Sequence, residues 1–239
     1  MISKWGHRMP QIYGIEHIIY LLIVIPLMIV STLWIRRVAT TEEKLQKIIK
    51  IIGILGLIAI TVNRISVSYL KDGFDKILPG TFCGTSSLML ALSAVIFKKD
   101  SIVFHSVLYV GLLGGLLTLF YPEFIGQGPT FFYPMTITAM IHHTLMVFLA
   151  WIMLASGYVR PTLSKWKYLP IGLSFYMSYG LFLITVLGYH DALYIYEPIL
   201  PDTFLNWAGL GSLLLPVHAI FLWVWDRYLK NVFPIIHTL

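Results

Sequence analysis

Long apolar runs are the feature that most limits how this chain can fold. Along its 239 residues they recur at about 20 residues each, the length that crosses about 30 Å of hydrocarbon as a helix. Lipid offers no hydrogen bonds to the backbone, so such runs must be helical. We therefore predict an all-α polytopic membrane protein, one domain over residues 1–239. Its seven transmembrane helices are expected at residues 12–35, 48–69, 79–97, 102–121, 131–157, 168–189 and 204–225.

The composition excludes several classes of protein. Hydrophobic residues make up 58% of the chain and charged residues 12%, about half the charged share of a soluble domain. The net charge of +6 lies in short loops between spans, where membrane topology accounts for it, so no nucleic acid partner is expected. One cysteine excludes an internal disulfide and any multi-cysteine metal site. The first apolar run is too long for a signal peptide and is expected to stay as a span.

Basic residues predict how the helices are oriented, because loops rich in Lys and Arg stay in the cytoplasm. Twelve fall on one side of the predicted spans and four on the other. The larger group is Arg36, Arg37, Lys44, Lys47, Lys50, Lys98, Lys99, Arg160, Lys165, Lys167, Arg227 and Lys230; the smaller is Lys4, Arg8, Lys71 and Lys76. The amino terminus is predicted outside and the carboxyl terminus in the cytoplasm.

Polar residues inside the spans are costly and mark candidate functional positions. Five fall in the outer third of the membrane: Glu16, His17, Asn63, Arg64 and Cys83. Two histidines, His143 and His218, lie deeper, about 13 to 18 Å from the outer ends of their helices. Together these residues are expected to line a cavity open to the outer leaflet.

Cys83 stands in the stretch ILPGTFCGTSSLML, at the start of a span. Pro79 suits the first helical position, which puts Cys83 in the first turn, where unpaired amides and the helix dipole favour a thiolate. A nearby imidazole would take the thiol proton, and the amides near Gly84 would hold an oxyanion. Arg64 would attract a phosphate headgroup.

Ordinary structural roles compete with this interpretation. Cys83 belongs to a stripe of small residues suited to helix packing, with Ser86, Ser87, Ala91 and Ala94. Arg64 could extend to the surface or pair with Glu16. His142 and His143 are adjacent, about 100° apart around a helix, so at most one is expected to face a given cavity. The glycines at 111, 114 and 115 indicate a close-packing face.

Several stretches resemble one family. ILPGTFCGTSSLMLALSAVIFKKD looks like the signature of the YwaF-like integral membrane proteins, a bacterial group related to eukaryotic transmembrane protein 164. YGIEHIIYLL, YVGLLGGLLTLFYPEF and FFYPMTITAMIHHTLMVFLAWIML match that family's first, fourth and fifth spans in order. The likeness covers about residues 10 to 165, and the last two spans look less familiar.

The resemblance implies a seven-span fold in the bacterial plasma membrane and, from the eukaryotic relatives, a cysteine-dependent acyltransferase acting on lysophospholipids. Carried over by position, Cys83 is the nucleophile, His143 the base and His17 the first-span histidine. Related androgen-induced membrane proteins hydrolyse fatty acid esters of hydroxy fatty acids. Here Phe82 replaces the usual polar residue before the cysteine, and His142 is an additional histidine.

The predicted function is therefore an acyltransferase or acyl hydrolase on lipid esters, with no cofactor or metal. Its catalytic candidates are Cys83, His143 and His17; its substrate-binding candidates are Arg64, Asn63, Glu16, Ser87 and His218. Two alternatives stay open, a transporter or lipid-binding protein with a polar cavity and a zinc hydrolase using the histidines. The sequence leaves the lipid and the oligomeric state open.

Depth sets one condition on the catalytic pair. If both helices run straight, His143 lies about 7 to 12 Å deeper than Cys83. A tilted helix or a start of the third span below the membrane surface would bring the two together. Otherwise His17, at the better depth, becomes the expected base.

Overall fold

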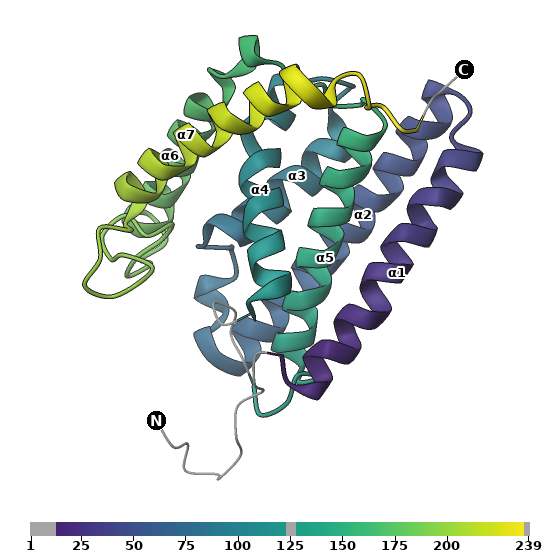
Figure 1. The fold of residues 1–239 in the computed structure, drawn as a ribbon. Coiled ribbons are helices and arrows are strands. Elements are labelled where there is room, and N and C mark those ends of the chain that lie inside the picture. Colours follow the sequence, from purple (N-terminus) through teal and green to yellow (C-terminus); the bar gives the residue numbers. More distant parts are fainter. Residues whose placement is uncertain (1–12, 123–127, 237–239) are drawn as a thin grey trace.

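Each predicted run contains a helix in the computed structural model, which describes residues 13–122 and 128–236 (Figure 1). The helices are α1 (Ile15–Val38), α2 (Glu42–Val67), α3 (Phe82–Ile96), α4 (Ile102–Phe120), α5 (Pro134–Ala155), α6 (Tyr168–Thr185) and α7 (Trp207–Val224). Short turns of other helix types are η1 (Ser68–Asp72), η2 (Phe74–Lys76), η4 (Leu163–Lys165) and η5 (Trp225–Leu229). This described part of the chain contains no strand, and six of its helices are long and apolar enough to cross a membrane.

Polar side chains and one proline fix where the helices begin. Thr81, Ser101 and Asn206 cap α3, α4 and α7, each accepting a hydrogen bond from an amide of the first turn. Pro134 occupies the first position of α5, where its missing N–H costs nothing. Thr41 caps α2 in the same way, so α2 starts six residues before the predicted 48.

Four helices form the centre of the bundle. α2 packs along α3 and α5, and α4 packs along α3, α5 and α6. Small residues let α2 and α3 approach closely: a Cβ on Gly53 would lie 2.8 Å from the Cβ of Ala94 and 2.9 Å from the carbonyl oxygen of Ala91. The predicted small-residue stripe on α3 is thus confirmed as a packing surface.

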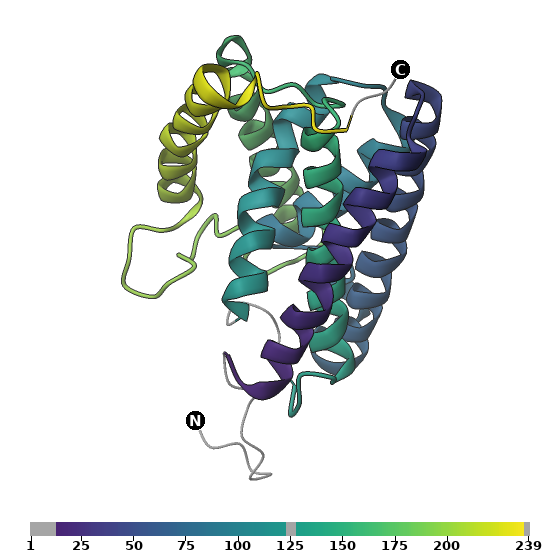
Figure 2. The same cartoon turned by 45° about the vertical axis from the view of Figure 1, so that its right-hand side comes forward.

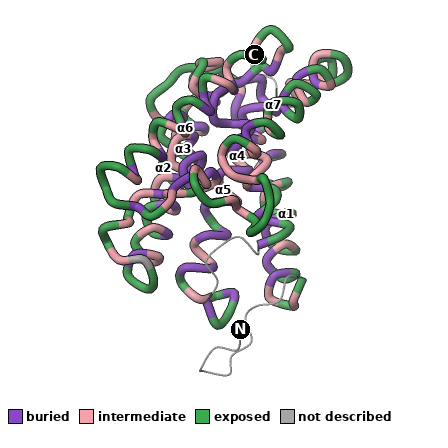
Figure 3. The backbone as a smooth tube through the Cα atoms, turned by 90° about the vertical axis from the view of Figure 1, so that its left-hand side faces the viewer, coloured by how far each residue is buried: buried purple, intermediate pink, exposed green. Residues whose placement is uncertain are grey.

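The outer helices are far less buried. α1 contacts α2 and α5 on one side of the bundle, whereas α6 and α7 lie on the opposite side (Figures 1 and 2). The described residues of α7 include three buried ones, Gly211, His218 and Leu222. Figure 3 shows the buried residues gathered on the inner helices and exposed ones on the outer faces. Exposed residues such as Leu22, Ile58 and Ile220 give these faces the apolar character that a lipid environment requires.

The loops that carry the larger group of basic residues lie together at the end of the bundle drawn at the top of Figure 1. There Asp100 accepts hydrogen bonds from Lys165 at 2.5 Å, from the Arg160 amide at 3.0 Å and from His105 at 2.8 Å. Burial raises the pKa of Asp100, but these three donors outweigh it and hold the pKa below its usual value. The grouping fits the predicted alternation of helix direction, and the assignment of this end to the cytoplasm stays a prediction.

Candidate functional site

The short length of α3 places its first residues inside the bundle. The helical segment Glu42–Lys71, which runs from α2 into η1, has 30 residues and is about 45 Å long, whereas the 15 residues of α3 cover about 22 Å. The two run antiparallel and meet at the end where Lys99 hydrogen-bonds to Glu42. Gly53 packs against Ala94 and Gly56 against Ala91, so Phe82 lies level with about residue 65 of α2, and α3 begins about 10 Å short of the other end of that segment. This recessed start is in the direction that the sequence required for a thiol to approach His143.

The backbone that leads to α3 is held by a series of side-chain donors. Non-helical backbone at this depth needs partners, and the carbonyls of residues 76–80 all accept hydrogen bonds. Arg64 donates to the first two, from Nη2 at 2.5 Å and from Nε at 3.1 Å. The next three accept from the Tyr189 hydroxyl at 2.9 Å, the Tyr179 hydroxyl at 3.1 Å and the Leu193 amide at 2.7 Å. We call this stretch the 76–80 segment.

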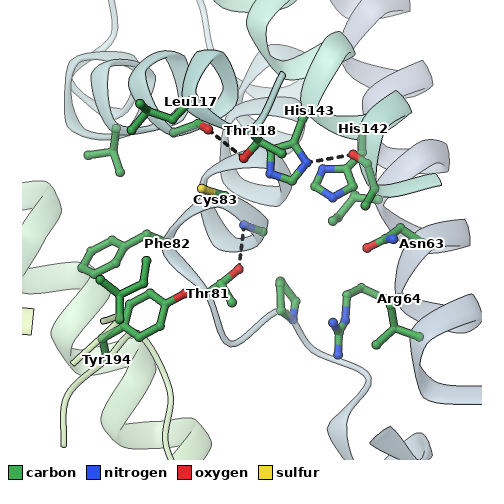
Figure 4. Close-up of a pocket in the computed structure, with 18 of the residues that line it drawn as sticks. Asn63, Arg64, Thr81, Phe82, Cys83, Leu117, Thr118, His142, His143 and Tyr194 are labelled. Atoms are coloured by element: carbon green, nitrogen blue, oxygen red, sulfur yellow. Dashed lines mark hydrogen bonds between the residues drawn. The ribbon is translucent and has the colours of Figure 1, made fainter. Parts of the chain in front are cut away.

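A cavity of about 380 Å³ opens beside the start of α3. Its walls come from α2, α3, α4, α5 and α7 and from the loop between α6 and α7. The polar residues that line it are Asn63, Arg64, Lys71, Thr81, Cys83, Thr118, His142, His143 and Tyr194. Figure 4 shows most of these side chains around the same hollow. We call it the thiol cavity.

Cys83 is the second residue of α3 and is partly exposed to the thiol cavity. The prediction that it lies in the first helical turn is confirmed. Pro79, however, is not the first helical residue: the helix starts at Phe82, after the cap at Thr81. Pro79 belongs instead to the 76–80 segment, where its carbonyl accepts from side chains. The amide of Gly84 donates to Thr81 Oγ1 at 3.1 Å, so the cap already uses one of the predicted oxyanion donors.

The thiol lies against α4. Cys83 lies beside the side chain of Thr118, whose hydroxyl donates to the carbonyl of Gly114 at 2.9 Å (Figure 4). A Cβ on Gly114 would lie 2.6 Å from Cys83 Sγ, closer than atoms can approach. Gly114 therefore provides the room that the sulfur occupies, which gives the predicted glycine face of α4 a specific role.

His143 presents a free basic nitrogen to the same cavity. Its Nδ1 lies 2.8 Å from the carbonyl of Ala139, which can only accept, so Nδ1 carries the proton and Nε2 has the lone pair. Nε2 is buried and finds no hydrogen-bond partner among the described residues. In Figure 4 the imidazole of His143 lies next to Thr118 and Cys83, with the unbonded nitrogen on their side.

Cys83 and His143 lie at the same level of the bundle. One turn of α4 touches both: Gly114 meets Cys83, and a Cβ on the neighbouring Gly115 would lie 3.5 Å from the carbonyl oxygen of His143. The expectation that only one of the paired histidines would face the cavity is wrong, because His142 also lines it. The two rings lean together, with centroids 4.1 Å apart. His142 Nδ1 lies 3.3 Å from the hydroxyl of Ser87.

The α2 side of the thiol cavity is cationic. Arg64 and Lys71 line it, and its described lining residues include no Asp or Glu. Asn63 also lines it, with its amide donating to the Met135 carbonyl at 3.2 Å and the Thr138 hydroxyl at 3.1 Å. This wall of the cavity therefore favours an anionic ligand group.

Comparison with known proteins adds one finding. The model of the TMEM164 family matches residues 12–226. The chain belongs to the TMEM164 family. No curated protein and no solved structure matches it.

The TMEM164 family match confirms the relation suspected from the sequence motifs and extends it. It spans α6 and α7, which looked unfamiliar in the sequence, so the donors Tyr179 and Tyr189 also lie within the family region. With its long apolar helices, this TMEM164 family chain is an integral membrane protein.

Two first-span candidates of this family member lie away from the thiol cavity. Both ring nitrogens of His17 are engaged: Nδ1 accepts from the Tyr13 amide at 3.2 Å and Nε2 donates to the Leu119 carbonyl at 2.8 Å. Glu16 accepts from the Phe131 amide at 2.8 Å. Both residues therefore tie the start of α1 to neighbouring segments, and neither lines the cavity.

The two remaining binding candidates, His218 and Ser87, also lie outside the lining of the thiol cavity. His218 lines a different cavity, beside Tyr109, and Ser87 contacts His142 from outside the cavity lining. His17, His143 and His218 are thus not brought together, and among the described residues no cluster of three His, Cys, Asp or Glu side chains could hold a metal ion.

Sequence reasoning missed three contributors to the site: Thr118, Tyr179 and Tyr189. Thr118 stands four residues after Gly114, a spacing that puts both on one helix face and could have drawn attention to it. The two tyrosines have no such signal, because their partners in the 76–80 segment are about 100 residues away.

Proposed function

We propose that this protein is a membrane-embedded acyltransferase or acyl hydrolase that acts on glycerophospholipid esters through Cys83 and His143. One observation carries the proposal: the only thiol of the chain shares a cavity with an imidazole whose proton is fixed on Nδ1 and whose Nε2 has no hydrogen-bond partner in the described part of the chain. In this tautomer Nε2 keeps its lone pair and can accept the thiol proton, as a general base must.

The reaction begins when His143 Nε2 takes the thiol proton and Cys83 Sγ attacks the carbonyl carbon of an acyl ester. The ester C–O bond breaks, and the leaving lyso-lipid oxygen receives the proton from His143. An S-acyl enzyme remains. The hydroxyl of a second lyso-lipid, or water, then gives its proton to His143 and attacks the thioester, and the sulfur leaves and is reprotonated.

Thr118 and the cationic wall supply the supporting interactions. Thr118, beside the sulfur, would orient the thiol by a hydrogen bond with its hydroxyl group. Arg64 and Lys71 are the residues that would attract the phosphate of a lipid headgroup while its ester lies near Cys83. Exclusion of water by the occupied cavity would favour transfer over hydrolysis.

Reconstitution in phosphatidylcholine vesicles with an isotope-labelled lysophospholipid tests the proposal. Mass spectrometry should detect labelled diacyl product with the wild-type protein and none with Cys83→Ala. An alkylating thiol probe gives an independent readout, because the chain has one cysteine and any label reports on Cys83. Lysophospholipid should slow the labelling by occupying the cavity. Unchanged product formation by Cys83→Ala would refute the assignment.

The size and cationic wall of the thiol cavity also suit a second function, transport or binding of an anionic lipid. That function predicts the opposite dependence on side chains. Lipid movement would persist in Cys83→Ala and fall in Arg64→Gln, measured as transfer of a fluorescent phospholipid between leaflets of the same vesicles.

A further inference from the structure

A second cavity lies between α4 and α7 and has a volume of about 200 Å³. Tyr109 and His218 are its polar residues. The others are apolar: Val110, Leu112, Leu113, Leu116, Leu169, Leu214, Val217 and Phe221. We call it the α4–α7 groove.

The groove adjoins the thiol cavity. Val110, Leu113 and Leu214 line both spaces, so the two meet at these three side chains. Leu113 precedes Gly114, the residue that makes room for the sulfur of Cys83. A chain attached to Cys83 and passing along α4 would therefore enter the groove within one helical turn.

The groove also borders the membrane. Leu116 and Val217 are 37% and 49% exposed, on faces that would contact hydrocarbon. α7 packs mainly against α6 rather than against α4, which leaves this side of the groove open to lipid. An aliphatic chain that entered from the bilayer would exchange one hydrocarbon environment for another and keep its ester at the thiol cavity.

We infer that the α4–α7 groove holds the aliphatic chain of the acyl group transferred by Cys83. The inference rests on the proposed function and adds the place where the chain lies. It selects long, unsubstituted chains, because ten side chains line the groove and eight of them are apolar. A second copy of the protein or another helix in the groove is the competing occupant.

A tethered probe tests the groove independently of catalysis. An alkyl maleimide with a diazirine at the end of a long chain would be attached to Cys83, the sole thiol, and irradiated in vesicles. Cross-links are expected at Leu116, Val217 and Phe221. Cross-links at the opposite walls, for example at Ile60 or Met135, would overturn the inference, and so would recovery of the Cys83 peptide with a probe whose diazirine end has reacted only with lipid or water. These readouts need no turnover. An error in the placement of the chain is therefore distinguishable from an error in the proposed acyl transfer.

A matched pair of variants tests the consequence for substrate choice. Val217→Trp fills the groove and should lower transfer of long chains relative to short ones about tenfold, the order set by mismatch in an apolar pocket. Ile220→Trp, on the same helix but outside the groove lining, should leave the ratio unchanged. An equal ratio of long-chain to short-chain transfer in the two variants would mean that the acyl chain lies outside the groove. A change in oligomeric state in Val217→Trp, with an unchanged ratio, would favour a second copy as the occupant.

Discussion

His143 and His218 offer the clearest comparison within the molecule. Both are buried in the described part of the bundle, and in both the Nε2 atom lacks a hydrogen-bond partner. His143 has its other nitrogen fixed by a carbonyl and shares its cavity with a thiol. The ring of His218 lies 4.4 Å from that of Tyr109, among aliphatic side chains. The proposed chemical role of the unpartnered atom therefore depends on its surroundings, a thiol and a cationic wall, and not on its burial alone.

Removing the imidazole of His143 should have the largest effect on acyl transfer and tests its side of this comparison. His143→Gln is expected to lower acyl transfer by about 10²- to 10⁴-fold, because it removes the imidazole whose unpartnered Nε2 is the proposed general base. The measurement is the rate of labelled diacyl product in vesicles. His190→Gln, in an exposed loop, is the control and should match the wild type. Retention of more than about a tenth of the rate by His143→Gln would remove this residue from the mechanism.

Displacing the sulfur should come next. In Gly114→Ala the new Cβ would lie 2.6 Å from Cys83 Sγ and force it away from Thr118, a shift expected to cost about 10²-fold in rate. Gly211→Ala is the matched control, since its Cβ would meet Leu173 at an ordinary 3.7 Å. Alkylation kinetics of the thiol provide the second readout. An equal loss of rate in both variants would mean that replacing a helical glycine by alanine, and not the displacement of the sulfur, lowers the activity.

Weakening the 76–80 segment should have a moderate effect. Tyr179→Phe combined with Tyr189→Phe removes the hydroxyl donor to Leu78 and one of the two hydroxyl donors to Pro79, and is expected to destabilise the protein by about 1 to 3 kcal/mol. Thermal unfolding in detergent measures this, and the alkylation rate of Cys83 should change with it. Tyr69→Phe, on an exposed side chain, is the control. A double variant with wild-type stability would show that these bonds do not hold the segment.

Replacing His218, the other histidine of this comparison, should have the smallest effect. His218→Leu replaces an unpartnered buried nitrogen with an apolar side chain, so it should raise the unfolding free energy by about 1 kcal/mol. Transfer of unsubstituted long chains should not fall. A clear loss of transfer would mean that His218 binds a polar group, which contradicts an aliphatic occupant of the groove.

The sequence predicted the general architecture because apolar length and periodicity are local properties. The seven helices follow from such runs, and the cap at Thr81 puts Cys83 in a first turn as expected. The depth of that turn was not predictable. It depends on groups of α6 and of the loop after it that donate hydrogen bonds to the carbonyls of the 76–80 segment. Likewise, the partners of His17 and Glu16 are distant backbone groups, Leu119 and Phe131, so their residue type alone suggested chemistry that their contacts do not support.

The 76–80 segment also has a consequence for biosynthesis. When α1 to α5 have left the ribosome, Arg64 can already bind the first two carbonyls and Thr85 the carbonyl of Pro79, but the donors to the carbonyls of Leu78 and Gly80 lie in sequence still to be translated. Each such carbonyl facing lipid alone would cost several kcal/mol. Cys83 is therefore expected to reach its final position only after α6 and Leu193 have been inserted, so a chain interrupted before that point would contain every proposed reacting atom and still be inactive.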